Sequence, residues 1–513
     1  MQSFAAARRT LMANYDHPER LTDFCFPEVV NFNWARDWFD FYAASCSDIA
    51  AAGPSLSGTW REVSYRLLKS TSQEVSAVLL RDGVSPGDRI MIDMTASVDL
   101  YAVLLGILRI GGVVIPVHHG LHPDALAERH AVARPSRVIS DRGGGLTGAL
   151  GADTLVRWHE TSRQLPDLDL SADAPAFGCF TSGTTGAPKL ALHSNRSHSV
   201  AHLASLYWNR LDVGQRHLNI SSPGWAKFFW SSFLVPLTAG ATVVVRPEWL
   251  GPAEFEDFVA EHDVSSVCAP VVFLRETLSR ASGSIRLDDL TSVGEIVPER
   301  LRQDAHRAWG VRLREGFGQT EATAMLGELA ARPGRWSVLP GYRIELAMAE
   351  GEPAPRLNFG ALAGGSFLGY LREDGTLTPP VLTPAGMQWT GDYATGALTD
   401  GTLRLLGRGD DVFRSNGHLV APAELEVLFE RHPAVRSAAV VPAETTDRGL
   451  VPVAFVVADH GSEAFDDAEV LRWVNERLPG EVDVVSLTVI EQLPRSINGK
   501  IQRSRLSQAA YQK

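Results

Sequence analysis

From about residue 59 onward, the hydrophobic positions of the chain follow two alternating patterns. Short apolar runs rich in Val and Ile predict buried strands, and longer segments with apolar residues at every third or fourth position predict helices. The predicted helices are residues 64–80 and 98–109, and the predicted strands are 89–94, 113–117, 137–140, 176–180, 218–221, 241–245 and 265–268. Strands separated by helices are typical of a mostly parallel sheet covered on both faces. The expected fold class is therefore α/β.

A second, more compact pattern begins after the segment Leu-Leu-Gly-Arg-Gly-Asp-Asp at residues 405–411. It predicts helices over 422–431 and 467–477, and strands over 438–441 and 453–457. We therefore expect a large domain over residues 1–408, built of layered, mostly parallel sheets with flanking helices. A small α+β domain is expected over residues 409–513.

Composition agrees with an ordinary multidomain protein. A chain of 513 residues is too long for one core, and 45% hydrophobic with 21% charged residues is typical of soluble proteins. The net charge of −12 argues against nucleic acid or an anionic membrane as a partner, and no apolar run is long enough to cross a membrane. The cysteines show no metal-binding spacing, which predicts reduced thiols in a cytoplasmic protein; they are Cys25, Cys46, Cys179 and Cys268.

The strongest chemical signal lies between Thr181 and Lys189, where two glycines and four hydroxyl residues precede the lysine. A strand is predicted before this loop, and a helix from His193 onward. Glycine lets the backbone approach an anion, amides and hydroxyls donate hydrogen bonds to it, and lysine adds a positive charge. The spacing differs from the common phosphate loop because Pro188 directly precedes the lysine. The predicted polyphosphate ligands are Thr181, Ser182, Gly183, Thr184, Thr185 and Lys189; a surface linker is the alternative.

Two later segments add groups that suit a nucleotide. Glycines on both sides of Phe317 leave its ring free to lie against a flat base, Thr320 can donate to a phosphate oxygen, and Glu321 can hold Mg²⁺. Asp392 follows a tight turn, where a carboxylate can accept both ribose hydroxyls. An ordinary glycine-rich turn is the alternative for each segment.

Taken in order, these segments resemble the adenylate-forming superfamily, which comprises acyl-CoA synthetases, aryl-CoA ligases, luciferases and peptide-synthetase adenylation domains. Residues 32–40, Phe-Asn-Trp-Ala-Arg-Asp-Trp-Phe-Asp, look like the opening of the medium-chain acyl-CoA synthetases. The resemblance extends over nearly the whole chain. It implies an enzyme that joins a carboxylic acid to AMP from ATP, with Mg²⁺, and then transfers the acyl group to the thiol of coenzyme A.

The resemblance also implies roles for particular residues. The small domain would rotate about Asp410 between an adenylating and a thioester-forming arrangement, and Lys500 would be the adenylation lysine, catalytic together with Thr320 and Glu321. The nucleotide would further be bound by Gly294, Glu295, Ile296, Gly316, Phe317, Gly318, Gln319, Asp392 and Arg408, coenzyme A by Ser415, Gly417 and His418, and the acyl group by Trp225, Phe228, Val272 and Phe273. The Trp- and Phe-rich lining suggests a bulky apolar or aromatic acid.

One position departs from the family. Medium-chain synthetases carry Gly-Tyr-Arg-Ile after the hinge, and coumarate ligases and luciferases carry Gly-Phe/Tyr-Gln-Val, whereas residues 416–420 here are Asn-Gly-His-Leu-Val. Leu419 therefore stands where an Arg or Gln would face the nucleotide. Losing a charge-assisted bond to a phosphate costs roughly 1.5–3 kcal/mol, or about one to two decades in rate. We expect impaired adenylation, partly offset by Arg414, with thioester formation retained.

Three alternatives remain open at this stage. A stand-alone adenylating enzyme could load a carrier-protein thiol instead of coenzyme A. A phosphate-loop NTPase would transfer phosphoryl groups, and a catalytically inactive protein would only bind its ligand. A separate adenylating enzyme would be a partner if adenylation here is weak, and a homodimer is left open.

Overall fold

The computed structural model describes residues 2–142, 149–182, 188–362, 366–445, 449–459, 465–478, 482–495 and 500–510, without the side chain of Ser182. By their internal contacts the residues form two compact units. Unit 1 consists of Met1–Gly294, Ala305–Arg343 and Gly360–Leu382, and unit 2 consists of Glu295–Asp304, Ile344–Phe359 and Thr383–Lys513. The sequence boundary predicted at residues 408/409 stays a prediction.

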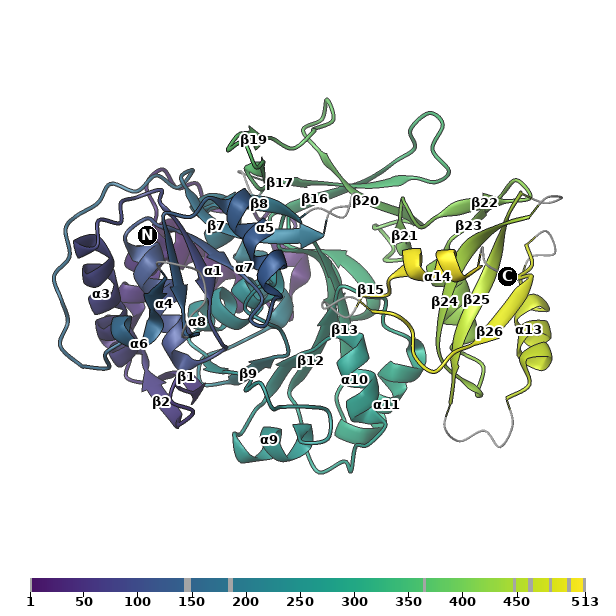
Figure 1. Ribbon diagram of the computed structural model, residues 1–513, viewed down its shortest axis with the longest axis horizontal. Helices are drawn as coiled ribbons and strands as arrows, with labels where there is room; N and C mark the ends of the chain where they lie inside the picture. Colours follow the sequence, from purple (N-terminus) through teal and green to yellow (C-terminus); the bar gives the residue numbers. More distant parts are fainter. Residues whose placement is uncertain are drawn as a thin grey trace. The chain divides into compact units, whose positions relative to one another are not determined.

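Unit 1 contains a mixed sheet that has nine strands among the described residues, in the order β15-β14-β13-β12-β11-β9-β10-β1-β2 (Figure 1). Strands β13, β12, β11, β9, β10 and β1 run parallel, and β2, β14 and β15 are antiparallel to their neighbours. The bounds are β1 Ile49–Pro54, β2 Trp60–Ser64, β9 Arg216–Asn219, β10 Thr242–Val244, β11 Ser266–Cys268, β12 Asp289–Val293, β13 Leu313–Gly318, β14 Ala324–Leu329 and β15 Arg332–Val338.

A second sheet of unit 1 has eight strands in the described part of the chain, in the order β19-β18-β8-β7-β4-β3-β5-β6. Strands β7, β4, β3, β5 and β6 are parallel, and β8, β18 and β19 are added antiparallel at one end. The bounds are β3 Arg89–Asp93, β4 Val113–Pro116, β5 Arg137–Ser140, β6 Leu150–Gly151, β7 Pro175–Ser182, β8 Pro188–Ser194, β18 Gly369–Leu371 and β19 Leu377–Thr378.

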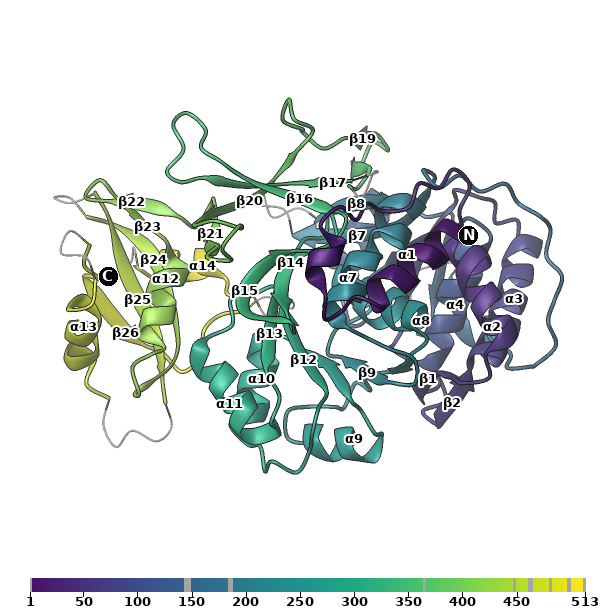
Figure 2. The same cartoon turned by 180° about the vertical axis from the view of Figure 1, so that it is seen from behind.

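Helices fill the space between these two sheets. Every residue of α4 (Val98–Arg109) is buried, because the helix packs on α3 (Tyr65–Arg81) and contacts both β1 and β4. Figure 2 shows α1 (Gln2–Met12) beside α7 (His202–Asn209), another helix of unit 1. The other helical segments of unit 1 are η1 Pro18–Leu21, η2 Trp34–Phe39, α2 Asp40–Ser45, α5 Pro123–Ala133, α6 Ala152–Leu155, η3 Asn195–Val200, η4 Phe228–Leu234, α8 Val235–Ala239, α9 Phe255–Glu261 and α10 Val271–Leu278, while α11 Glu299–Trp309 crosses from unit 2 into unit 1.

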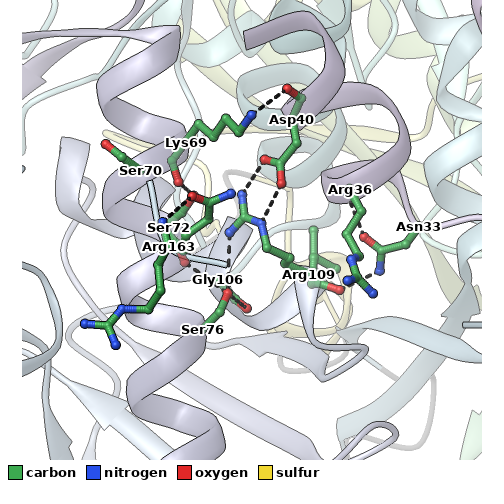
Figure 3. Close-up of polar contacts among 12 residues, drawn as sticks. Asn33, Arg36, Asp40, Lys69, Ser70, Ser72, Ser76, Gly106, Arg109 and Arg163 are labelled. Atoms are coloured by element: carbon green, nitrogen blue, oxygen red, sulfur yellow. Dashed lines mark hydrogen bonds and ion pairs between the residues drawn. The ribbon is translucent and has the colours of Figure 1, made fainter. Parts of the chain in front are cut away.

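Hydrogen bonds and an ion pair hold the aromatic segment at residues 32–40 in place. Asn33 caps η2 and donates a 2.6 Å hydrogen bond to the carbonyl of Leu108. Asp40 accepts two hydrogen bonds, of 2.7 and 3.0 Å, from the guanidinium of Arg109, whose side chain is 1% exposed, while Lys69 donates to the Asp40 carbonyl (Figure 3). Removing Asp40 would leave the buried Arg109 guanidinium without its carboxylate, which is destabilising. This segment therefore anchors the chain between helices.

Unit 2 is built mainly from antiparallel strands. Its described residues form most of a four-stranded sheet, β16-β17-β20-β21, together with the hairpin β22–β23 and a three-stranded sheet, β24-β25-β26. Separate apolar clusters lie at the three-stranded sheet, one with α12 and α13 and one with α14. The bounds are β16 Tyr342–Ala347, β17 Arg356–Ala361, β20 Gln388–Thr395, β21 Arg404–Arg408, β22 Phe413–Ser415, β23 His418–Val420, α12 Pro422–Phe429, β24 Val435–Thr445, β25 Gly449–Ala458, α13 Asp467–Asn475, β26 Ser486–Val489 and α14 Arg503–Ala510.

The expected α/β class, with layered sheets in a large unit and an α+β arrangement in a smaller one, is confirmed. The predicted helices and strands occur with small differences at their ends, except that β24 and β25 extend further than expected. The helix predicted from His193 onward was wrong at its start, because strand β8 continues to Ser194. Within the described ranges, no helix has the length and apolar character needed to span a membrane. All four cysteines are free, and Cys179 and Cys268 are buried.

Candidate nucleotide and acyl site

The hydroxyl-rich loop joins two antiparallel strands, β7 and β8, and not a strand and a helix as predicted. Residues 190–194 are buried on both faces of β8, so their apolar pattern did not reveal a strand period. Thr181 pairs directly with Lys189, so the two side chains lie on the same face of the hairpin. Gly183, Thr184 and Thr185 lie outside the described residues. Lys189 is exposed next to the loop, where its ammonium can meet a phosphate.

The turn that carries Thr320 and Glu321 follows β13 and is held by the other sheet. The imidazole of His193 contacts the carbonyl of Thr320 at 2.6 Å, and the amide of Phe367 donates to the carbonyl of Glu321 at 3.2 Å. The hydroxyl of Tyr370 donates to Oε1 of Glu321. The Lys189 ammonium lies 5.8 Å from the centre of the Tyr370 ring. The fold thus brings Lys189 and Glu321, distant in sequence, to one place.

Burial explains the chemistry of His193. Desolvation lowers the pKa of this fully buried imidazole to about 4, so it is neutral near pH 7. A neutral imidazole has one donor and one acceptor. Nε2–H therefore donates to Thr320, and Nδ1 accepts from the Ser197 hydroxyl at 3.2 Å.

The glycines around Phe317 have packing reasons. A Cβ at Gly316 would lie 2.4 Å from the Trp208 ring, and one at Gly318 would lie 2.4 Å from the Thr323 carbonyl. Gly294, by contrast, has φ +107°, and a Cβ placed on it would meet no atom within 4 Å, so the end of β12 borders open space. That space suits a ligand better than the crowded surroundings of Gly316 do.

Within unit 2, Asp392 and Arg408 are opposite residues of β20 and β21. Arg408 donates to the Thr390 carbonyl at 3.0 Å and lies 3.5 Å from the Asp392 carboxylate. A Cβ at Gly391 would be 2.8 Å from the Arg408 guanidinium, so this glycine makes room for the arginine. Burial raises the pKa of Asp392, and the charges of Arg408 and Lys500 act in the opposite direction. Lys500 therefore lies close enough to act on Asp392 electrostatically.

The other predicted groups of unit 2 differ in exposure and in the side chains that they contact. Lys500 is exposed, and it is also among the charges that oppose the burial-driven rise in the pKa of Asp411. Asp410 is exposed in the turn after β21. Glu295 and Arg495 form an ion pair at 3.4 Å, which occupies one oxygen of a carboxylate predicted to bind nucleotide; its neighbour Ile296 is half-buried.

The hairpin β22–β23 turns at Asn416 and Gly417, whose φ values are +49° and +80°. Asn-Gly is the preferred pair for a two-residue hairpin turn, so Gly417 has a conformational reason to be glycine. Gly417 and His418 are exposed, whereas Ser415 is buried. Coenzyme A could reach the first two more easily than the serine.

Leu419, on the same hairpin, is half-buried against an apolar cluster. The cluster contains Ala354, Tyr393, Leu406 and Ala421, with Trp389 and Val412 at its edge. Arg414, which pairs with Leu419 across the hairpin, donates to the Gly417 carbonyl at 2.8 Å. Its guanidinium is thus directed to its own turn.

The four acyl-pocket candidates do not share one environment. Trp225 is half-buried, 6.4 Å from the His118 ring, and in the described part of the chain its buried indole N–H has no partner. Phe228 is buried near Tyr101, and Val272 is half-buried. Phe273 packs on Phe255 at 5.6 Å, which favours a core role. A surface cavity of about 630 Å³ lies elsewhere, lined by Glu28, Val29, Val30, Asp173, Ser194, Arg196, Ser366 and Leu368.

Sequence reasoning missed Tyr370, Phe367 and the contact role of His193. One weak signal was available at Tyr370, because a glycine precedes it in a glycine-rich stretch. Gly369 has φ +142°, and a Cβ there would lie 2.2 Å from the Thr378 carbonyl. Nothing local indicated that Tyr370 reaches Glu321, which is 49 residues away.

The residues fit Mg²⁺ held together with a nucleotide. The described ranges contain no cluster of three or more His, Cys, Asp or Glu side chains that could hold a metal. Mg²⁺ usually takes one or two carboxylates plus substrate phosphates and water. Glu321, close to Lys189, could supply such a carboxylate.

The hydroxyl-and-lysine hairpin offers donors and a positive charge for phosphate oxygens, and the carboxylate turn offers a ligand for a metal ion. The chain belongs to the AMP-binding enzyme family, whose model matches residues 41–363, and the model of the AMP-binding enzyme C-terminal domain matches residues 424–500. The predicted adenylate-forming superfamily is confirmed, and so is the enzyme class, an AMP-forming acid–thiol ligase.

Curated relatives extend over almost the whole chain. The 4-hydroxybutyrate–CoA ligase 1 of Metallosphaera sedula is 29% identical, over 95% of this chain and 92% of that protein. The mitochondrial acyl-coenzyme A synthetase ACSM5 of Mus musculus is 27% identical, over 93% and 90%. The 3-hydroxybenzoate–CoA/4-hydroxybenzoate–CoA ligase of Thauera aromatica is 26% identical, over 87% and 92%.

Solved structures show the same fold. The anthranilate CoA ligase AuaEII in complex with anthranoyl-AMP superposes with a TM-score of 0.81 at 20% identity, covering 94% of this chain and 98% of that one. ATP-bound MatB from Rhodopseudomonas palustris gives a TM-score of 0.80 at 22% identity, covering 94% and 99%.

Proposed function

We propose that this protein is an acyl-CoA ligase that makes a thioester from a carboxylic acid through an acyl-adenylate. The observation that carries the proposal is the meeting of Lys189 and Glu321 around Tyr370 in unit 1. A cation for phosphate oxygens and a carboxylate for Mg²⁺ are what an ATP-dependent activation needs. The family match supports the same function.

In the first half-reaction, a carboxylate oxygen of the acid attacks the α-phosphorus of ATP, and pyrophosphate leaves. Negative charge gathers on the phosphates, so the enzyme acts by positioning and by supplying cations. Lys189 and Thr181 would hold the outer phosphates, Asp392 the ribose, and Lys500 the developing charge at the α-phosphate. Mg²⁺, bound through Glu321, would neutralise part of the phosphate charge.

In the second half-reaction, the thiolate sulfur of coenzyme A attacks the acyl carbon, and AMP leaves. The thiol reacts as its thiolate. We assign the exposed hairpin turn at Gly417 and His418 to the passage of this thiol-bearing arm. The reaction needs the small domain to turn about Asp410, as the family resemblance implies.

The acid is proposed to be bulky and apolar or aromatic. Trp225 supports this class because its half-buried ring offers aromatic surface, and its unpartnered indole N–H offers one hydrogen bond. The relatives do not choose an acid, since their names range from 4-hydroxybutyrate to hydroxybenzoates. Phe273 is the weakest of the four candidates because it packs on Phe255.

The adenylation half-reaction is proposed to be impaired. Leu419 has no charge or hydrogen-bonding group, and it packs on the apolar cluster around Tyr393 and Leu406. Arg414 is a poor substitute because it binds the Gly417 carbonyl. The enzyme would then act mainly as a thioester-forming enzyme on an acyl-adenylate, supplied by a separate adenylating enzyme.

The test is a panel of acids, and of their synthetic adenylates, each incubated with coenzyme A and read by thioester mass. Acids are given with ATP and Mg²⁺. Thioester from at least one adenylate is expected, with a slower reaction from the matching acid. Loading of a carrier-protein thiol with no reaction of coenzyme A would favour the stand-alone adenylating enzyme, and ADP as product would exclude this function. A cytoplasmic location and a homodimer stay predictions.

A further inference from the structure

Three contacts hold the Thr320–Glu321 turn, which joins β13 and β14 of the nine-stranded sheet: one comes from β8, one from β18 and one from the segment that leads into β18. His193 on β8 binds the Thr320 carbonyl, the amide of Phe367 binds the Glu321 carbonyl, and the Tyr370 hydroxyl on β18 binds the Glu321 carboxylate. Two of these bonds fix backbone, but the third acts on the side chain expected to hold Mg²⁺. Of the three contacts, the bond from Tyr370 is therefore the one that acts on the Glu321 carboxylate itself.

The ladder between β8 and β18 places Tyr370 with respect to both charged groups. Tyr370 pairs with Ala191, two residues from Lys189, in an antiparallel register. Its ring lies under the Lys189 ammonium at 5.8 Å and is fixed edge-on by Phe367 at 4.9 Å between ring centres. The hydroxyl is then directed to Oε1 of Glu321. One side chain thus contacts the phosphate lysine through its ring and the carboxylate through its O–H.

We propose that Tyr370 is a positioning residue that orients the Glu321 carboxylate for Mg²⁺ and keeps it in register with Lys189. The phenol O–H occupies one lone pair of Oε1, and Oε2 would then be the oxygen that Glu321 offers to Mg²⁺. Groups that hydrogen-bond to a metal-binding carboxylate fix its orientation, and their loss typically lowers metal affinity by about 10–100-fold. The inference rests on the proposed function, because it takes Glu321 as the Mg²⁺ ligand.

Two variants separate the ring from the hydroxyl. Tyr370→Phe keeps the ring under Lys189 and removes the bond to Glu321, whereas Tyr370→Leu removes both. The matched control is Tyr65→Phe, which removes a buried hydroxyl that donates to the Ala241 carbonyl at 2.8 Å on the same unit. Circular dichroism and thermal melting confirm that each variant is folded.

The readout is ATP binding by calorimetry, without acid or coenzyme A, over a series of Mg²⁺ concentrations. For Tyr370→Phe, we expect the Mg²⁺ concentration that gives half of the metal-dependent gain in ATP affinity to rise about 10–100-fold. Affinity for ATP without metal should be unchanged in this variant and reduced in Tyr370→Leu. Tyr65→Phe should match the unaltered protein throughout.

The proposal is overturned if Tyr370→Phe shows the same Mg²⁺ dependence as the unaltered protein, or if the unaltered protein binds ATP equally well with and without Mg²⁺. It is also overturned if Tyr370→Phe loses as much affinity for ATP in the absence of metal as Tyr370→Leu does. Failure of the proposed function would look different. The unaltered protein would then bind ATP with Mg²⁺ but make no thioester from any acid or adenylate.

Discussion

The turn at Glu321 and the hairpin at Leu419 differ in polarity: the first brings charged and polar side chains together, and the second holds a half-buried apolar one. At Glu321, two sheets of unit 1 gather a carboxylate, a phenol and an ammonium around one point. At Leu419, a position where the family resemblance implies Arg or Gln, the side chain packs on apolar residues of unit 2. In each region the side chain suits its surroundings, but the two regions would serve different steps of the proposed reaction.

This difference suggests that the two half-reactions have been separated. The groups that would hold phosphates and metal are present, together with Asp392, Arg408 and Lys500. What the chain lacks is a polar side chain at residue 419, the position that the family resemblance implies would face the nucleotide during adenylation. On the proposed function, holding an adenylate would need only the first set of groups, whereas making one would also need a polar group at residue 419.

Lys500→Ala should have the largest effect, because Lys500 is proposed to be the cation at the α-phosphate, where the charge of the adenylation step develops. Removing one preorganised donor from a charged transition state typically costs about 10²–10³-fold in rate. We expect a loss of that order in thioester formation from acid and ATP, and little change when the adenylate is supplied. Coupled detection of thioester measures both.

Arg505→Ala is the control for this experiment, since it removes an exposed positive charge from neighbouring α14. It should leave both rates near their starting values. Equal losses in the two half-reactions of Lys500→Ala would contradict the assignment of this lysine to adenylation.

Leu419→Arg should place a charged group at the hairpin and so reduce its difference in polarity from the Glu321 turn. Restoring a charge-assisted bond to phosphate is worth about one to two decades in rate, so acid-dependent ATP–pyrophosphate exchange should rise by about 10–100-fold. Leu450→Arg, which adds an arginine at a side chain 37% exposed on β25, is the control and should not raise exchange. A folded Leu419→Arg protein with unchanged exchange would show that this position does not limit adenylation.

Lowering the pH should destabilise the fold around Glu321, because His193 beneath this turn is buried in its neutral form. The pKa of this histidine is about 4 in the folded protein and 6.5 as a free side chain, so the unfolded chain binds the additional proton. The stability that comes from neutral His193 is complete above pH 6.5 and is lost as the pH falls toward 4. One such group changes the free energy of unfolding by up to about 1.4 kcal/mol per pH unit.

His193→Gln should therefore flatten the fall in unfolding free energy between about pH 6.5 and 5, measured by urea denaturation. Glutamine can still donate to the Thr320 carbonyl. His306→Gln, at an exposed position of α11, is the control. An unchanged slope in His193→Gln would contradict a neutral, buried imidazole beneath the turn.

The sequence predicted the fold well wherever helical periodicity was clear, as in α3 and α4. It failed at His193, because a strand buried on both faces has no alternating pattern. Candidate site residues inside motifs, such as Lys189 and Asp392, could be singled out by residue type and spacing. Tyr370 could not, because its role depends on a ladder between β8 and β18 that joins residues far apart in the chain.

The most direct test compares two rates in one preparation of the unaltered protein. One is the consumption of a preformed acyl-adenylate with coenzyme A, and the other is ATP–pyrophosphate exchange driven by the same acid. A separation of the half-reactions predicts that thioester formation exceeds exchange by about one to two decades. Exchange as fast as thioester formation would contradict it.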